Sequence, residues 1–229
     1  AGIGGGSSGN GGTIRITDGT VTATGDRSGA GIGGGALGDG GTIIISGGTV
    51  TAESVVLEVN GQEWIGAGIG AGGHSATTDE ANIPKNGTFS TGDAGQAVIV
   101  ASSIGDQSGK EAWSGILFEG DTGWVYGKDV QPKANFTIPP EKTLTIATEQ
   151  TLIIAEGITA VNYGTINNNG TITVSGTFVN QGKIEGNMPP ENTITDVPTL
   201  KESTFTYTGT NLFENLIFAS DGAESDWKL

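Results

Sequence analysis

The chain repeats itself near its start. Residues 1–24 recur 29 positions later as residues 30–53, and 17 of the 24 positions are identical. A fixed period of this length indicates stacked copies of one supersecondary unit. Each copy is too small and too rich in glycine to bury an apolar face alone, so it must pack on its neighbours. The repeat therefore favours a solenoid over a compact globular domain.

Within each copy, apolar and polar residues alternate with a period of two, which is typical of β-strands. The second copy keeps the phase of the first, so Thr20 should lie over Thr49 at about 4.8 Å, the spacing of neighbouring strands. The aliphatic positions of this pattern should face the core, and they are Ile14, Ile16, Val21, Ile43, Ile45 and Val50.

A second regular stretch lies further along the chain. Gly164, Gly170, Gly176 and Gly182 fall every six residues, and an aliphatic or aromatic residue follows each glycine at the same offset. Residues 54–130 contain strand-like segments without a strict repeat, and we interpret them as longer excursions from the same helix. The sequence therefore predicts an all-β fold, a single-stranded parallel β-helix (β-solenoid) over residues 1–186, right-handed by preference.

The regular pattern stops at Met188-Pro189-Pro190. Two consecutive prolines cannot donate to a β-ladder, so the solenoid should end there. Residues 187–229 are too few for a comfortable independent domain. We expect them to be either a C-terminal cap over the open end of the solenoid or the beginning of a truncated following module.

Composition excludes several partners. The chain has 25 Asp and Glu against 10 Lys and Arg, a formal charge of −15, which disfavours nucleic acid and anionic membranes. No stretch of 18 apolar residues predicts a membrane span. Cysteine is absent, which excludes disulfides and Cys-ligated metals and is common in surface proteins of Gram-positive bacteria.

Three stretches of the chain resemble one group of proteins. They are the AGIGGG repeat, AVIVASSIGDQSGKEAWSGILFEGDTGWVYG at residues 97–127, and FTIPPEKTLTIATEQTLIIAEG at residues 136–157. They resemble repeats of large secreted surface proteins of Gram-positive gut bacteria, described as carbohydrate-binding-domain-containing or hypothetical. The resemblance implies a pectate-lyase-like parallel β-helix that is extracellular or attached to the cell wall. It implies a stalk, an adhesin or a glycan binder, and it assigns no catalytic residue in this sequence.

One segment resembles a calcium-binding motif. Residues 34–41, GGALGDGG, are similar to the nonapeptide in which carbonyls and aspartates of successive turns bind Ca²⁺. The spacing of the glycines differs by one residue, and Asn10 replaces Asp39 in the preceding copy. Asp39 is therefore the candidate Ca²⁺ ligand of the repeat, and no complete metal site is assigned.

Aromatic residues gather in the irregular part of the chain. Trp113, Trp124 and Tyr126 lie close to Glu119 and Asp121 in sequence. If Val125 points inward, the rings of Trp124 and Tyr126 are exposed and, beside the carboxylates, could stack on sugars. The alternative is that these aromatics fill a widened section of core or cover it beneath a loop.

The leading functional prediction is an extracellular structural or adhesive β-helix module of a bacterial surface protein. Its partners would be neighbouring repeats of the same parent chain. The second prediction is a module that binds host or dietary glycan, with or without Ca²⁺ as the only cofactor. A polysaccharide lyase or hydrolase comes third. We expect no enzyme activity, because the chain has one His, no Cys and no arginine placed for lyase chemistry.

Overall fold

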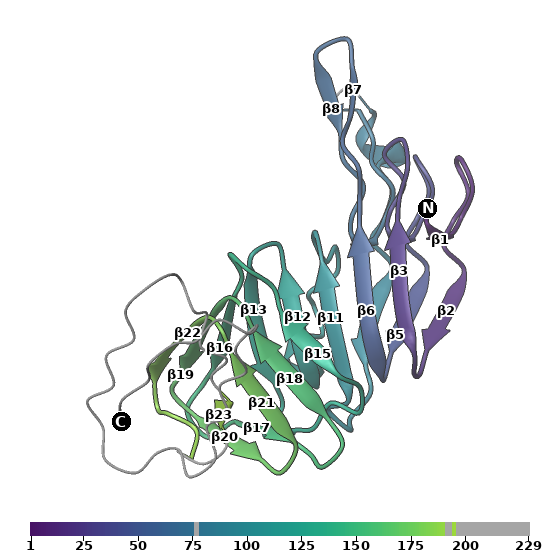
Figure 1. The fold of residues 1–229 in the computed structure, drawn as a ribbon. Helices are drawn as coiled ribbons and strands as arrows, with labels where there is room; N and C mark the ends of the chain where they lie inside the picture. The colour runs from purple at the N-terminus through teal and green to yellow at the C-terminus, as the bar shows by residue number, and fades with distance from the viewer. Residues whose placement is uncertain (76–77, 191–193, 196–229) are drawn as a thin grey trace, which may run out of the picture. The chain divides into compact units, whose positions relative to one another are not determined.

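The computed structural model describes residues 1–75, 78–190 and 194–195. They belong to one compact unit, Ala1–Val197, and form stacked parallel sheets. The predicted parallel β-helix is confirmed (Figure 1). It consists of two successive solenoid segments, which we call the N-terminal coil (residues 1–119) and the C-terminal coil (residues 122–195).

The N-terminal coil has three turns, each with a two-residue strand and two longer strands. The first turn contains β1 (Ile3–Gly4), β2 (Thr13–Ile16) and β3 (Thr20–Thr24), and the second β4 (Ile32–Gly33), β5 (Thr42–Ile45) and β6 (Gly48–Glu53). The third contains β9 (Ile69–Gly70), β10 (Thr88–Thr91) and β11 (Ala97–Ala101), and β12 (Gly115–Glu119) completes the coil.

The register of the repeat is as predicted. Thr20 pairs with Thr49 in the parallel ladder between β3 and β6, and Ile14 pairs with Ile43 between β2 and β5. All six predicted aliphatic positions belong to or pack against one core cluster. The three aliphatic positions of the second turn, Ile43, Ile45 and Val50, are fully buried. Ile14 and Val21 of the first turn remain partly exposed, because that turn has a neighbour on one side only.

The glycines of the repeat permit close stacking of turns. Gly33 has a φ of 133°, a conformation that disfavours any side chain. A Cβ at Gly33 would lie 2.0 Å from the carbonyl oxygen of Gly70 in the next turn. A Cβ at Gly4 would likewise lie 2.0 Å from the carbonyl oxygen of Gly33, so the fourth residue of the AGIG segment is glycine for steric reasons.

The C-terminal coil has three strands in each of its first three turns, and two further strands follow. Its strands are β13 (Thr122–Tyr126), β14 (Asp129–Val130), β15 (Phe136–Ile138), β16 (Thr143–Ile146), β17 (Thr151–Ile154), β18 (Thr159–Asn162), β19 (Thr165–Asn168), β20 (Thr171–Val174), β21 (Thr177–Asn180), β22 (Lys183–Gly186) and β23 (Ile194–Thr195). Thr165 pairs with Lys183, so the turn that begins with β19 has 18 residues, and the predicted hexads are its three sides.

One eight-stranded sheet joins the two coils, in the order β22-β19-β16-β13-β12-β11-β6-β3. All neighbours in it are parallel except β12 and β13, which form an antiparallel pair. Strand direction therefore reverses at the turn Gly120–Asp121. The sequence predicted a single continuous helix through this region, and the reversal of the chain was not predicted.

The two coils lie on opposite faces of this sheet. Ile99 and Leu117 belong to the core of the N-terminal coil, whereas Val98 and Ile116 belong to the core of the C-terminal coil. Both the strand direction and the buried face change at the reversal. Together these two changes amount to a rotation of the coil by 180° about the axis along which the strands stack. A rotation leaves handedness unchanged, so the two coils have the same handedness.

Short elements interrupt the N-terminal coil. A hairpin of β7 (Leu57–Val59) and β8 (Gln62–Trp64) follows β6 and projects away from the coil (Figure 1). The 3₁₀ helix η1 (Glu80–Asn82) lies between β9 and β10, and η2 (Lys110–Ala112) lies between β11 and β12. The hairpin and both helices therefore fall between strands, where insertions leave the stacked turns intact.

One described strand of the C-terminal coil lies after residue 186. Strand β23 lies after Met188-Pro189-Pro190 and pairs in parallel with β21, so the prolines interrupt the ladder without ending it. The predicted cap or truncated module falls almost entirely on residues 196–229, which lie outside the described residues.

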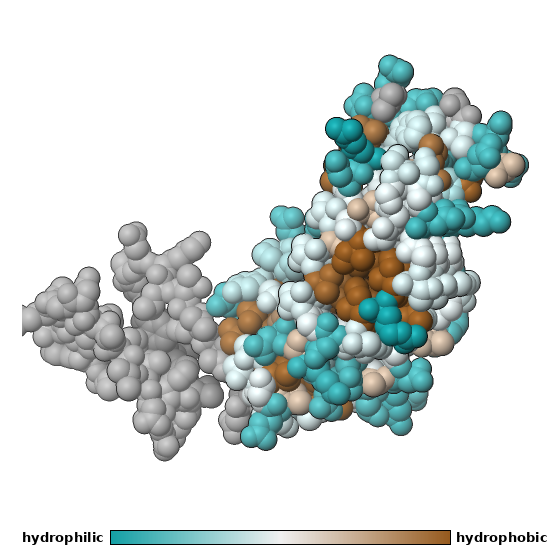
Figure 2. Space-filling model, turned by 90° about the vertical axis from the view of Figure 1, so that its right-hand side faces the viewer, coloured by the Kyte–Doolittle hydropathy of each residue, from teal (hydrophilic) through white to brown (hydrophobic). Residues whose placement is uncertain are grey.

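The beginning of the N-terminal coil is an open end. β1, β2 and β3 each form the last strand of their sheets in the described part of the chain. Ile3, Ile14 and Val21 lie there, half-buried against the core. Figure 2 views this end of the molecule and shows an apolar patch at its centre with polar residues around it.

Candidate functional site

The hairpin β12–β13 carries four of the five predicted ligand-binding residues. Because Glu119 pairs with Thr122, Leu117 with Trp124 and Gly115 with Tyr126, the side chains of Glu119, Trp124 and Tyr126 share one face of the hairpin, and Asp121 lies in its turn. On β12 this face is the interior of the N-terminal coil, and on β16 it is the exterior of the C-terminal coil. Glu119, Trp124 and Tyr126 thus lie where this face of the sheet changes from buried, on β12, to exposed, on β16.

Trp113 lies in the core and cannot stack on a sugar in this conformation. It follows η2 and is 5% exposed. Its ring contacts Phe89 edge-on, with centroids 5.1 Å apart, and Tyr126, with centroids 5.3 Å apart. The three rings close the end of the N-terminal core at β10 and β13. Trp113 therefore fills the core, which is the position that the alternative interpretation gave to these aromatics.

Trp124 and Tyr126 differ in exposure although they share a face. Val125 is buried as expected, and Trp124 is 39% exposed. The ring of Tyr126 packs on Trp113, so Tyr126 is half-buried. Burial raises the pKa of the Tyr126 hydroxyl, and the nearby Glu119 carboxylate raises it further. One exposed ring, that of Trp124, therefore remains of the predicted aromatic platform.

The carboxylate of Glu119 is held by protein donors. Its Oε1 accepts a hydrogen bond from the backbone N–H of Ile104 at 2.9 Å, and its Oε2 accepts one from Nε2 of Gln107 at 2.8 Å. These bonds tie the loop after β11 to the end of β12. They satisfy one lone pair on each oxygen, so Glu119 serves as a structural acceptor in this arrangement.

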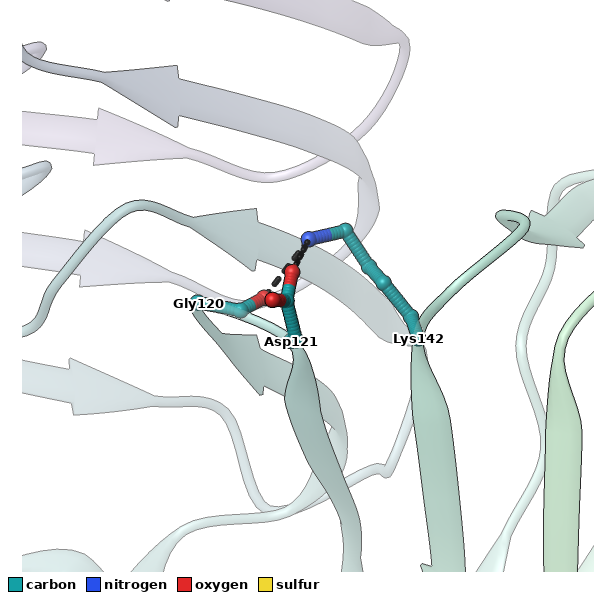
Figure 3. Close-up of polar contacts among 3 residues, drawn as sticks. All are labelled: Gly120, Asp121 and Lys142. Carbon is teal, nitrogen blue, oxygen red and sulfur yellow. Dashed lines mark hydrogen bonds and ion pairs between the residues drawn. The ribbon is translucent and has the colours of Figure 1, made fainter.

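Asp121 lies at the turn where the chain reverses. Nζ of Lys142 donates to the carbonyl oxygen of Gly120 at 2.6 Å and to Oδ1 of Asp121 at 3.3 Å (Figure 3). The carboxyl of Asp121 is 81% exposed, so this ion pair contributes little to stability. Lys142 itself is mostly buried and holds the reversal turn against the start of β16.

A polar cluster precedes Trp113. Hydrogen bonds from the Ser108 hydroxyl at 2.7 Å and from its backbone N–H hold the pKa of Asp106 below its usual value. The other oxygen of Asp106 accepts from the N–H of Phe89 at 3.4 Å. Asp106 thus connects the loop that leads to Trp113 with the strand that carries Phe89.

Asp39 has a structural role in the stacked turns. Its Oδ1 accepts a hydrogen bond from the backbone N–H of Lys85 at 2.7 Å, and its own N–H donates to Oδ1 of Asn10 at 2.9 Å. These bonds link three successive turns. Among the described residues, no three His, Asp or Glu side chains gather in a cluster that could hold a metal ion.

The sequence did not predict a groove between the two coils, which we call the junction groove. Its volume is about 660 Å³. One wall is the outer face of β3 and β6, and the other is formed by β15 and β18 with the residues around them. The alternation of β3 and β6 indicated an outward threonine row. The second wall depends on the reversal at β12–β13, which no local pattern showed.

The described residues contain no helix long and apolar enough to cross a membrane. Neither a curated protein nor a solved structure matches the chain. The β-helix repeat family model matches residues 14–36 and 43–73, which include most of the two copies that stack in the N-terminal coil. The chain therefore contains a β-helix repeat domain.

Proposed function

We propose that the chain is a structural or adhesive module of an extracellular bacterial surface protein, in which stacked β-helix turns extend the protein. The observation that carries this proposal is the stacking of two near-identical turns in register, with Ile14 on Ile43 and Thr20 on Thr49. The first two turns are near copies, so the surface that the first turn presents to solvent matches the surface by which the second turn binds it. A further copy of the repeat would therefore fit the open end formed by β1, β2 and β3.

Exposed strand edges beside apolar surface also tend to associate with other strands. Covering them with a neighbouring repeat of the same parent chain pairs the backbone groups and buries Ile3, Ile14 and Val21. The resemblance to surface proteins of Gram-positive gut bacteria and the absence of cysteine support an extracellular or cell-wall location. An antibody against the chain should then label intact bacterial cells that carry the parent protein.

The experiment joins an extra copy of residues 1–29 ahead of Ala1, which preserves the natural spacing of 29 residues between turns. Burial of the three half-buried aliphatic side chains should raise the free energy of unfolding by about 2–4 kcal/mol. A matched control carries Ile14→Asp in the added copy alone and should give no increase. The proposal fails if the extended chain unfolds at the same denaturant concentration as the original.

Glycan binding is the second candidate function, and the exposed ring of Trp124 favours it. Ring faces that remain accessible on β-sheets can stack on pyranose rings. A glycan array should then show binding that Trp124→Ala removes and Trp124→Phe largely keeps. Binding that is equal in all three proteins would exclude this residue as the contact.

We also propose that the chain catalyses no polysaccharide cleavage. The proposal rests on composition, because the chain has one His, no Cys and only two Arg, Arg15 and Arg27, from which to build a catalytic group of residues. Incubation with pectin, xylan and mucin glycans should release neither reducing ends nor unsaturated products. A product whose formation depends on one carboxylate would contradict this.

A further inference from the structure

The junction groove has two walls contributed by different coils. Thr20, Thr49 and Thr51 line it from the outer face of β3 and β6, and Thr137 and Thr159 line it from β15 and β18. The Thr49 hydroxyl donates to the carbonyl oxygen of Asn135 at 3.4 Å and so joins the two walls. The groove is therefore fixed in place by the fold, with no loop needed to form it.

Apolar side chains lie beneath these hydroxyls. Val98 and Phe136 are buried and line the groove, together with the half-buried Val100 and Val161. Threonine also contributes a methyl group beside each hydroxyl. The groove thus presents alternating hydroxyl and hydrocarbon surface, and its volume is within the usual range for small-molecule sites.

Most of the hydroxyls are available to a ligand. In the part of the chain that the structure describes, those of Thr20, Thr51, Thr137 and Thr159 have no hydrogen-bond partner in the protein, and each offers one donor and two acceptor positions. Thr20 and Thr49 are in register on neighbouring strands, so they are about 4.8 Å apart. This spacing is close to the length of a pyranose ring.

The charges in the groove balance. Glu53 and Lys142 line it, and together they have no net charge. Nζ of Lys142 already donates to Gly120 and Asp121, which leaves one of its three donors. The chain as a whole has a charge of −15, which repels polyanions. A neutral ligand rich in hydroxyl groups therefore fits better than a charged one.

We propose that the junction groove binds a short segment of a neutral oligosaccharide. The hydroxyls of Thr49, Thr51 and Thr159 exchange hydrogen bonds with the sugar hydroxyls, and the ring hydrogens lie against Val100 and Val161. An extended peptide fits less well, because the neighbouring edge strand β15 has three residues and Pro139, which follows it, has no N–H to donate. This site is separate from Trp124 and does not depend on the structural role of the open end.

The test is a titration followed by backbone amide chemical shifts. Separate samples receive xylohexaose, cellohexaose or mannohexaose, with hexagalacturonate as the anionic comparison and a neutral Thr/Val hexapeptide as the peptide comparison. At least one neutral oligosaccharide should shift the amides of Thr49, Thr51 and Thr159, with Kd around 1 mM, since the groove offers no exposed aromatic ring among its lining residues.

Two variants separate binding from folding. Thr51→Val with Thr159→Val keeps the β-branched shape and removes two hydroxyls that have no partner in the protein, and it should weaken binding about tenfold. Thr22→Val removes a hydroxyl from the same face outside the groove and should leave Kd unchanged. Three results would overturn the proposal: no shift at the groove with any neutral oligosaccharide, tighter binding of the hexagalacturonate or the peptide, or equal weakening by the two variants.

Discussion

Val98 and Ile99 are consecutive residues of β11 whose side chains are buried in different hydrophobic cores. Val98 is 1% exposed and packs in the C-terminal coil, and Ile99 is fully buried in the N-terminal coil. Because successive residues of a strand point to opposite faces, this requires apolar packing on both sides of the shared sheet. β11 and β12 are thus the structural link between the two coils.

The first turn should be less important for stability than the second. Ile14 and Ile43 occupy equivalent positions and pair with each other, but only Ile43 is fully buried. Ile43→Ala should lower the free energy of unfolding by about 3 kcal/mol, and Ile14→Ala by about 1 kcal/mol. Urea denaturation of the two variants measures this difference. Equal losses would mean that the first turn is covered in solution.

The aromatic cluster should behave as core rather than as a binding surface. Trp113→Ala should destabilise the chain by about 3–5 kcal/mol, because it removes a buried ring between Phe89 and Tyr126. Trp113→Phe keeps a ring in place and should cost clearly less. Trp124→Ala, at the exposed position, should cost about 1 kcal/mol or less. A greater loss for Trp124 than for Trp113 would reverse our assignment.

The loop before Trp113 should lose stability in acid. The pKa of Asp106 is lowered in the folded state, so its contribution is present above the unfolded pKa of about 3.9 and is lost as pH falls through the folded value. Asp106→Asn should therefore be less stable than the wild type at pH 7, and the gap should narrow below pH 4. Denaturation at a series of pH values checks this, and a gap that widens in acid would contradict it.

Much of the N-terminal coil could be predicted from sequence, because its repeat reports both phase and register. The alternation of Ile14 with Thr13, compared with the second copy, was sufficient to predict which side chains face the core. The hexads of the C-terminal coil were equally informative. Both signals are local and periodic, so they can be recognised in the sequence without knowledge of the tertiary structure.

The reversal and the groove could not be predicted in the same way. The run from Ala97 to Ala101 is almost continuously apolar, which is typical of a strand buried on both faces, but this signal does not say what covers the second face. Residue spacing likewise cannot distinguish a ring on the surface from one that closes a core, which is where Trp113 lies. The junction groove depends on residues more than 100 positions apart, such as Thr20 and Thr137.

The central claim is that two coils occupy opposite faces of one sheet, and cysteine labelling tests it directly because the chain has no native cysteine. Val98 lies in the same register row as Thr49 and Thr20, which in a single solenoid would point to solvent. Single variants Val98→Cys, Ile99→Cys and Thr20→Cys are treated with an alkylating reagent under native conditions. We predict that positions 98 and 99 both react at least about a hundredfold more slowly than position 20. Reaction at position 98 as fast as at position 20, with position 99 protected, would contradict the account.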